Sequence, residues 1–203
     1  MGQIREPFEE ECYYHVFNHS NGVENLFREA KNYHFFLRKL SKYVTPIANI
    51  LAYCLMPNHF HLILQIEKES KLSSSSNFNN FSNTSDLISH HFGNLQNSYA
   101  KSINKKYNRR GSLFNQSIKR KKIISEEYLR HAIIYTHLNP VSHDFCMKPE
   151  DWEYTSYKSY IDNTSMLLAI EKGLGLFDGL DNFIYNHNTR TFEKYAEKLK
   201  LDY

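Results

Sequence analysis

The sequence predicts an α+β fold in which helices pack on one face of an antiparallel sheet. Runs of aromatic and β-branched residues alternate with segments of helical periodicity, in the order β-α-β-β-linker-α-β-α. A short turn between two of the β-prone runs indicates a hairpin, which favours antiparallel strands. With 203 residues, of which 41% are hydrophobic, the chain can bury the core of one domain, or of one domain with an appendage.

The first half of the chain is expected to form three strands and one helix. Residues 12–18 are aromatic and β-branched and predict the first strand. Residues 32–43 carry apolar side chains at helical spacing and stop before a proline, which predicts a helix. Residues 47–55 and 59–66 are β-prone and predict a hairpin with a turn at 56–58.

The second half begins with a polar segment. Residues 71–86 are rich in serine and asparagine and predict a linker or loop within the domain. Asp86 is placed to cap a helix over 87–107, whose apolar positions recur at helical spacing. A fourth strand is predicted over 112–124.

A further helix is expected over 125–138, opened by a serine cap and two acidic residues, and Pro140 should end it. These elements place the main domain at 1–160. Residues 161–203 are expected to form a C-terminal helical extension, with a charged final helix at 181–200.

Basic side chains are concentrated in one segment. Residues 101–122 hold nine lysines and arginines and no acidic residue, which leaves 16 bases against 22 acids in the rest of the chain. A basic segment in an otherwise acidic chain favours binding to a polyanion, and a solvated helix face is the alternative. The side chains expected to bind the polyanion are Lys105, Lys106, Arg109, Arg110, Lys119, Arg120, Lys121 and Lys122.

Two further features bear on location. No apolar run approaches the roughly 20 residues that a membrane helix needs, and the first ten residues lack the apolar stretch of a signal peptide. Cys12, Cys54 and Cys146 are odd in number and widely spaced, and they do not form a metal knuckle. These features predict a cytoplasmic protein with reduced thiols and no membrane partner.

Two histidines lie in the expected third strand. Side chains alternate between the faces of a strand, so His59 and His61 point to one face while Phe60 and Leu62 point to the other. Two imidazoles on one rigid strand form half of a divalent-metal site. Taken alone, such a pair is more often hydrogen-bonded polar side chains than ligands, so a metal site needs support from elsewhere in the chain.

Support comes from the helix expected to begin at Ser125 and to end before Pro140. His131, Tyr135 and Asn139 lie four residues apart and therefore share one helix face. Asn139 offers a carbonyl oxygen, a hard ligand that suits magnesium or manganese. Tyr135 is either a partly buried phenol satisfied by one hydrogen bond or a nucleophile. A nucleophilic phenol, with a pKa of about 10, needs help from a cation that polarises a phosphodiester.

Four segments occur in the same order in one protein family: 56–62 (MPNHFHL), 108–114 (NRRGSLF), 135–141 (YTHLNPV) and 151–157 (DWEYTSY). In these segments the chain resembles the REP-associated tyrosine transposases, a branch of the single-tyrosine HUH transposases, which mobilise single-stranded DNA. The resemblance covers about residues 12–160. Four ordered segments are far more specific than any one of them.

The resemblance implies a ferredoxin-like fold with the histidine pair on a central strand. It implies that His59 and His61 bind a divalent metal, magnesium or manganese, and that Asn139 completes the metal site. It also implies that Tyr135 attacks DNA to form a 5′-phosphotyrosine link and a 3′-hydroxyl. Substrates of the family are single strands that fold into hairpins beside a short guide sequence. Family members often have glycine at the position of Asp144.

Three functions are weighed on these residues. The first is a metal-dependent DNA strand transferase that acts as a monomer or homodimer, with Tyr107 and Phe114 as candidates for stacking on bases. Phe114 is more readily explained as a core residue. The second function is a DNA-binding protein of the same fold without strand transfer. The third, a nucleotide hydrolase, would need further histidines at alternate positions, and residues 55–66 contain only two.

Overall fold

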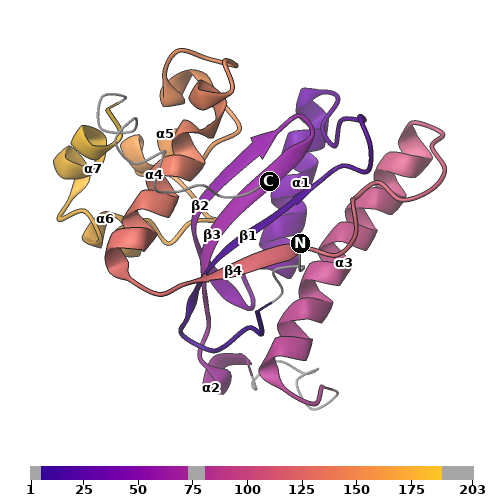
Figure 1. Cartoon of the computed structure of the whole chain (residues 1–203), viewed down its shortest axis with the longest axis horizontal. Coiled ribbons are helices and arrows are strands. Elements are labelled where there is room, and N and C mark those ends of the chain that lie inside the picture. The colour runs from indigo at the N-terminus through magenta and orange to yellow at the C-terminus, as the bar shows by residue number, and fades with distance from the viewer. Residues whose placement is uncertain (1–5, 73–80, 189–203) are drawn as a thin grey trace.

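The computed structural model describes residues 6–72 and 81–188 of the chain (Figure 1). Its sheet has four antiparallel strands in the order β2-β3-β1-β4. The strands are β1 Tyr13–His19, β2 Ala48–Met56, β3 His59–Ile66 and β4 Lys119–Ile123. This order, with helices between β1 and β2 and between β3 and β4, is that of the ferredoxin-like fold, so the predicted α+β class is confirmed.

β2 and β3 form the predicted hairpin. Met56 pairs with His59 across the turn made by Pro57 and Asn58. On its other side, β3 pairs with β1, so that His59 lies opposite His19. β3 is therefore an inner strand, and both of its histidines are held within the sheet rather than at an edge.

Two helices cover one face of the sheet. They are α1 Ala30–Tyr43 and α3 Thr84–Lys106, which also pack against each other (Figure 1). Phe60, Leu62 and Leu64 of β3 belong to the main core cluster on this face. The predicted alternation along β3 is confirmed for these three apolar side chains.

The other face of the sheet is covered by α4, Glu126–Ser142 (Figure 1). Ile63 and Ile123 of the sheet pack with Leu129 and Ile133 of α4 in a second core cluster. The expectation of helices on one face therefore holds for α1 and α3, whereas α4 lies on the opposite face. The sheet is a middle layer, and α4 faces the histidine side of β3.

The boundaries of α3 and β4 differ from those expected. Asn83 caps α3 instead of Asp86: its Oδ1 accepts the N–H of Asp86 at 2.9 Å, and its Nδ2 donates to the Asp86 carboxylate at 3.0 Å. α3 therefore starts three residues before Leu87. β4 is shorter than the predicted strand because Gln116 adopts a φ of 62°, which interrupts an extended backbone.

The predicted end of the helix before Pro140 was wrong, because α4 continues to Ser142. A proline removes one backbone donor, and near a helix end the remaining carbonyls find other partners. The N–H of His143 bonds to Asn139 O at 3.1 Å, and the N–H of Phe145 bonds to Pro140 O at 2.9 Å. The extra turn carries the chain to His143, beside the histidine side of the sheet.

The linker predicted over 71–86 is only partly described. Its first residues end a short helix, α2 Glu69–Leu72, in which Leu72 is buried, and its last residues belong to α3. Residues 73–80 lie outside the described residues, as do residues 189–203, which include positions 189–200 of the predicted final helix. No helix in the described ranges is both long and apolar enough to cross a membrane.

The described part of the predicted extension packs against α4. After a 3-10 turn at Pro149–Asp151 come α5 Tyr157–Ile161, α6 Ile170–Gly175 and α7 Leu180–Asn186. The hydroxyl of Tyr160 donates to Leu51 O of β2 at 2.5 Å. Phe183 of α7 is fully buried, and its ring stacks on Tyr160 with centroids 4.7 Å apart. The proposed division at residue 160 stays a prediction.

We expect Phe183→Ala to lower the free energy of unfolding by about 3–5 kcal/mol, because it leaves a cavity in the core beneath α4. Ile184→Ala, at a position 41% exposed on the same helix, is the control and should change stability by no more than about 0.5 kcal/mol. Chemical denaturation followed by circular dichroism measures both. If Phe183→Ala removed a separate early unfolding transition and left the main unfolding transition unchanged, the result would show instead that the extension folds independently.

Candidate active site

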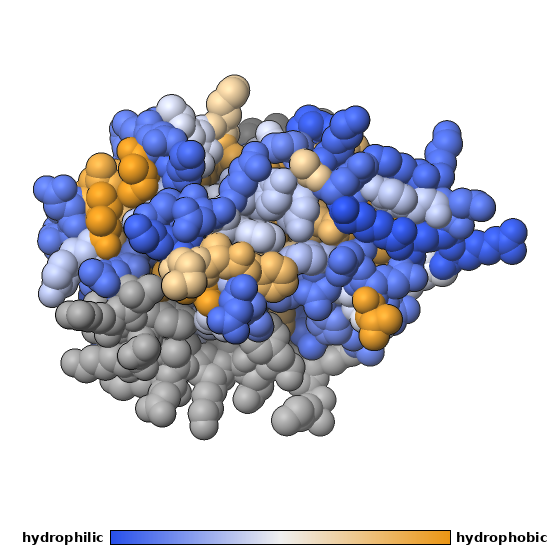
Figure 2. Space-filling model, turned by 90° about the horizontal axis from the view of Figure 1, so that it is seen from above, coloured by the Kyte–Doolittle hydropathy of each residue, from blue (hydrophilic) through white to orange (hydrophobic). Residues whose placement is uncertain are grey.

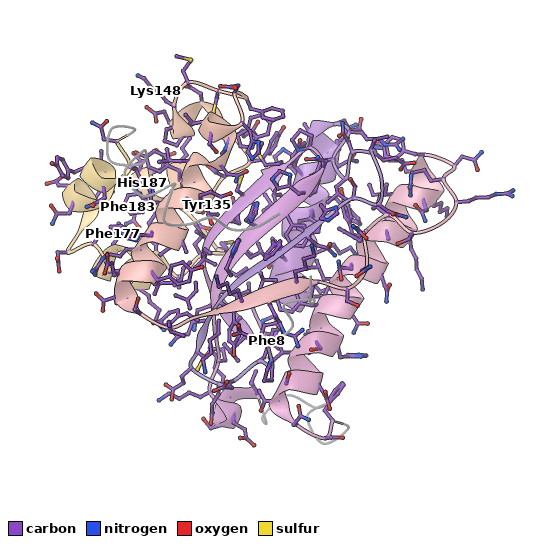
Figure 3. All side chains as sticks on the ribbon, viewed as in Figure 1. Phe8, Tyr135, Lys148, Phe177, Phe183 and His187 are labelled. Atoms are coloured by element: carbon purple, nitrogen blue, oxygen red, sulfur yellow. The ribbon has the colours of Figure 1, made fainter. Side chains whose placement is uncertain are left out.

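The histidine side of β3 and one face of α4 lie opposite each other. The rings of His61 and Tyr135 are edge to face with centroids 6.1 Å apart, and His59 Nε2 lies 3.3 Å from Asn139 Oδ1. The rings of His59 and His61 are 5.1 Å apart. Figure 3 shows Tyr135 on the side of α4 that faces the sheet. The structure thus brings together the four residues singled out as catalytic or metal-binding.

The four side chains differ in burial. Asn139 and His61 are buried, whereas His59 and Tyr135 are half-buried. The amide and one imidazole are therefore held in the protein interior, while the phenol and the other imidazole keep some contact with solvent. A large substrate can reach a site of this kind without the core opening.

Both ring nitrogens of His59 lie beside amide oxygens. Its Nδ1 is 2.8 Å from Asn58 Oδ1, and its Nε2 is 3.3 Å from Asn139 Oδ1. A neutral imidazole carries one proton, and in the tautomer with that proton on Nδ1 the lone pair of Nε2 is available to a cation. Nε2 of His59 and Oδ1 of Asn139 are donor types that suit a divalent cation.

Burial keeps both imidazoles neutral, the form that coordinates metals. Desolvation lowers the pKa of His59 to about 4. Desolvation also lowers the pKa of His61 well below its usual value, and the neighbouring His15 adds to that effect. The described ranges contain no cluster of three His, Cys, Asp or Glu side chains suited to a metal. A site here therefore depends on the amide of Asn139 as the third ligand.

His15 of β1 is a site residue that the sequence analysis missed. Its Nε2 lies 2.8 Å from Nδ1 of His61, and both rings are buried. This bond engages one nitrogen of His61 and fixes the plane of the ring, as partners of metal-bound histidines do. The two residues are 46 positions apart, and only the register of β1 against β3 brings them together. No local pattern in the sequence signals this contact.

His143 also lies near the site, with its ring 5.8 Å from that of His59. It continues the four-residue spacing of His131, Tyr135 and Asn139, which would have placed it on the same helix face. His143 was not predicted to lie there, because Pro140 was expected to end the helix. The next residue, Asp144, has a φ of 58°. Glycine suits this left-handed conformation best and aspartate tolerates it, which accounts for the glycine often found there in the family that the sequence resembles.

The basic residues of β4 are divided between the two faces of the sheet. Lys119 lies over the ring of Phe17, and Lys121 lies over the ring of Tyr128, with ammonium-to-centroid distances of 5.9 and 5.6 Å. Phe17 pairs directly with His61. Lys119 and Lys121 therefore lie on the same side of the sheet as the candidate active site.

Arg120 and Lys122 point to the opposite side. The guanidinium of Arg120 lies 4.3 Å from the ring centroid of Phe8, and Lys122 Nζ is 2.7 Å from the carboxylate of Glu9. All four residues were expected to bind the polyanion together. Because strand side chains alternate, only two of them share the side of the active site.

Of the basic residues at the end of α3 and just after it, two are paired with acidic side chains of the protein. Lys106 forms an ion pair with Glu29, and Arg109 forms one with Glu24. The other two expected contacts, Lys105 and Arg110, are exposed. Most of the surface seen from above in Figure 2 is hydrophilic, and apolar residues form separate patches.

The two candidates for base stacking have structural roles. The hydroxyl of Tyr107 lies 2.9 Å from the Glu29 carboxylate and 3.0 Å from Asn32 Oδ1. Phe114 is 5% exposed and belongs to the main core, as the sequence favoured. Phe17, half-buried beside Lys119, is the aromatic ring that the structure places near the active site.

A ferredoxin-like sheet whose inner strand presents two histidines to a tyrosine-bearing helix is the arrangement implied by the transposase-like segments. No family model and no curated protein matches the sequence. Among solved structures, the fold matches a REP-associated tyrosine transposase bound to a REP hairpin. The TM-score is 0.60 and the identity 14%, over 84% of this chain and 90% of that chain. The chain therefore has the fold of a REP-associated tyrosine transposase, and the resemblance seen in the sequence is confirmed for the fold.

Proposed function

We propose that the protein cleaves and rejoins single-stranded, hairpin-forming DNA with Tyr135 as the nucleophile. The observation that carries this proposal is the position of Tyr135 opposite His61, with ring centroids 6.1 Å apart. The similar fold of a transposase whose structure holds a REP hairpin supports a DNA substrate. The cysteines are free, in keeping with action in the cytoplasm, and a monomer and a homodimer both suit the proposal.

In the proposed reaction, the phenolic oxygen of Tyr135 attacks a phosphorus atom of the DNA backbone. The bond from that phosphorus to the 3′ oxygen breaks, which leaves a 5′-phosphotyrosine and a 3′-hydroxyl. The phenol loses one proton and the departing oxygen gains one, so the step is balanced. Attack of a 3′-hydroxyl on the phosphotyrosine rejoins DNA without a nucleotide cofactor, because the link keeps the energy of the broken bond.

His59, His61 and Asn139 would hold a magnesium or manganese ion. When bound, the ion would polarise the phosphodiester and stabilise the departing oxygen. The protein contributes orientation: His15 holds the ring of His61, and Asn58 holds that of His59. The packing of α4 on the sheet sets the position of the phenol relative to both rings.

The proposal is tested by incubating the protein with single-stranded hairpin DNA and Mg²⁺ or Mn²⁺, followed by denaturing electrophoresis. A covalent protein–DNA adduct supports strand transfer. Binding without an adduct on every hairpin tried would favour the DNA-binding protein that lacks strand transfer. Absence of binding would contradict both.

Lys119 and Lys121 are expected to carry more of the DNA affinity than their neighbours on β4. Lys119→Ala or Lys121→Ala should each reduce the slope of log affinity against log salt by about 0.7, the value for one phosphate contact on a single strand. Lys122→Ala removes the same charge from the other side of the sheet, where Glu9 pairs with it, and should leave the slope unchanged. Fluorescence anisotropy over a salt series measures all three. Equal slopes in the three variants would place the DNA elsewhere.

A further inference from the structure

Basic side chains gather on α1 and α3, on the side of the sheet away from the active site. The two helices run antiparallel. Nδ1 of His91, in the first half of α3, lies 2.9 Å from Tyr43 O at the end of α1. The hydroxyl of Tyr107, just after α3, lies 3.0 Å from Asn32 Oδ1 near the start of α1. The sheet separates both helices from α4 and its Tyr135.

Five of these side chains form a surface that we call the basic face. Arg38 and Lys42 are exposed one turn apart on α1, and Lys39 is half-buried between them. Lys101 and Lys105 are exposed one turn apart on α3. The basic face therefore carries one row of charge along each helix.

Few acidic side chains lie near the basic face. α1 contains no aspartate or glutamate, and α3 contains only Asp86, in its first turn. Bases elsewhere pair with carboxylates, as Lys106 does with Glu29, but none of the ion pairs among residues 6–72 and 81–188 involves the basic face. Its charges are therefore available to an anion from outside the protein.

Two aromatic rings support the charges of α1. The Phe35 ring centroid lies 5.6 Å from the guanidinium of Arg38 and 4.9 Å from the ammonium of Lys39. The Tyr43 ring centroid lies 5.3 Å from the ammonium of Lys42. These contacts orient the cations before any partner binds. They also occupy the rings, so neither ring is free to stack on an unpaired base.

The size and chemistry of the basic face fit duplex DNA. From the level of His91 to Lys105 the helix pair extends about 20 Å, at 1.5 Å per residue, and a duplex carries one phosphate charge for roughly every 1.7 Å of its axis. Contacts to phosphates alone suit a duplex, whereas single strands also need stacking. A lipid surface would require apolar side chains that insert, and the exposed large apolar residues in the described ranges all lie outside α1 and α3.

We propose that the basic face binds the phosphate backbone of a separate DNA duplex, without preference for its sequence, while the active site on the other side of the sheet acts on the single strand. This binding does not require the chemistry of Tyr135, so the inference goes beyond the proposed function. It lets the protein stay on duplex DNA whether or not the active site is occupied.

A double variant, Arg38→Gln/Lys42→Gln, tests the basic face. It removes two exposed charges, and glutamine keeps a high helix propensity. The control is Lys148→Gln/Lys158→Gln, which gives the same net charge but changes exposed residues in the segment that packs on α4. Both variants should melt close to the wild-type temperature.

The probes are a labelled duplex of about 30 base pairs and a labelled hairpin, followed by fluorescence anisotropy between roughly 50 and 200 mM salt. For the duplex, the slope of log affinity against log salt should fall by about 1.8 in Arg38→Gln/Lys42→Gln, which is 0.9 for each phosphate contact. Its affinity for the hairpin should stay within about twofold of the wild type, and the control should keep both affinities. One equivalent of unlabelled hairpin should not displace the duplex.

An unchanged duplex slope in Arg38→Gln/Lys42→Gln, or displacement of the duplex by the hairpin, would overturn the inference and leave the proposed function standing. Equal losses for duplex and hairpin would also overturn it, because one surface would then bind both. So would an equal fall in the control, which would show an effect of net charge alone. A wild type that binds vesicles of phosphatidylserine but no duplex would assign the basic face to lipid instead. Binding of the duplex without binding of any hairpin would overturn only the proposed function.

Discussion

Replacement of Tyr135 by phenylalanine should abolish covalent DNA adducts and leave DNA binding within about twofold of the wild type. The phenolic oxygen is the only atom removed, and the ring that faces His61 is kept, so the fold and the DNA surface stay intact. Loss of a nucleophile lowers the rate by on the order of 10⁴-fold or more. Denaturing electrophoresis measures the adduct, and anisotropy on the same hairpin measures binding.

The structure also supplies the control for this experiment. Tyr99 is not a credible nucleophile, because it is fully buried in the core and its hydroxyl donates to Leu26 O at 2.8 Å. Tyr128, half-buried on α4 beside Lys121, is the stronger alternative candidate for the nucleophile. Tyr128→Phe should therefore keep the adduct. An adduct that persists in Tyr135→Phe and vanishes in Tyr128→Phe would reassign the nucleophile.

Replacement of His61 by alanine should abolish binding of Mn²⁺, measured by titration calorimetry, and with it metal-dependent cleavage of DNA. His61 offers one of the two imidazoles of the proposed site, and its loss leaves only His59 and the amide of Asn139 as protein ligands. His59→Ala should have the same effect. Cleavage by the wild type that is unaffected by a chelator would contradict the metal role.

His15→Phe tests the support of that ligand. Phenylalanine fills a similar volume but leaves Nδ1 of His61 without its partner at 2.8 Å. The affinity for Mn²⁺ should fall roughly 10- to 100-fold, less than the loss in His61→Ala, as is usual for partners of a metal ligand.

His137→Gln is the matched control, because His137 is equally buried but bonds to Ser156 and His187 instead. It should lower the melting temperature and leave the affinity for Mn²⁺ unchanged. If His15→Phe and His137→Gln lost equal affinity for Mn²⁺, the loss would come from a general change in packing and not from the contact of His15 with His61.

Several features of the site followed from local patterns. The alternation of β3 separated His59 and His61 from Phe60, and the spacing of four placed Tyr135 and Asn139 on one helix face. Both depend on the geometry of a single element. That the histidine side of β3 lies opposite the Tyr135 face of α4 was inferred from resemblance to a family, because no local rule says which side of the sheet α4 covers.

Other features needed the whole fold. The contact of His15 with His61 depends on strand register, and the division of the basic residues of β4 depends on which face α4 occupies. The four-residue spacing could have predicted that His143 lies near the site, but the helix was expected to end before Pro140 and the spacing was not extended beyond it.

The sequence by itself determined the α+β class, the hairpin that carries the histidine pair, and the helix face that carries Tyr135, because periodicity within short segments encodes each of them. Tertiary structure alone decided which of these surfaces meet and which side chains support them. Contacts between residues 46 positions apart, such as His15 and His61, arise from pairing and packing of distant strands, and no short window of sequence contains that information.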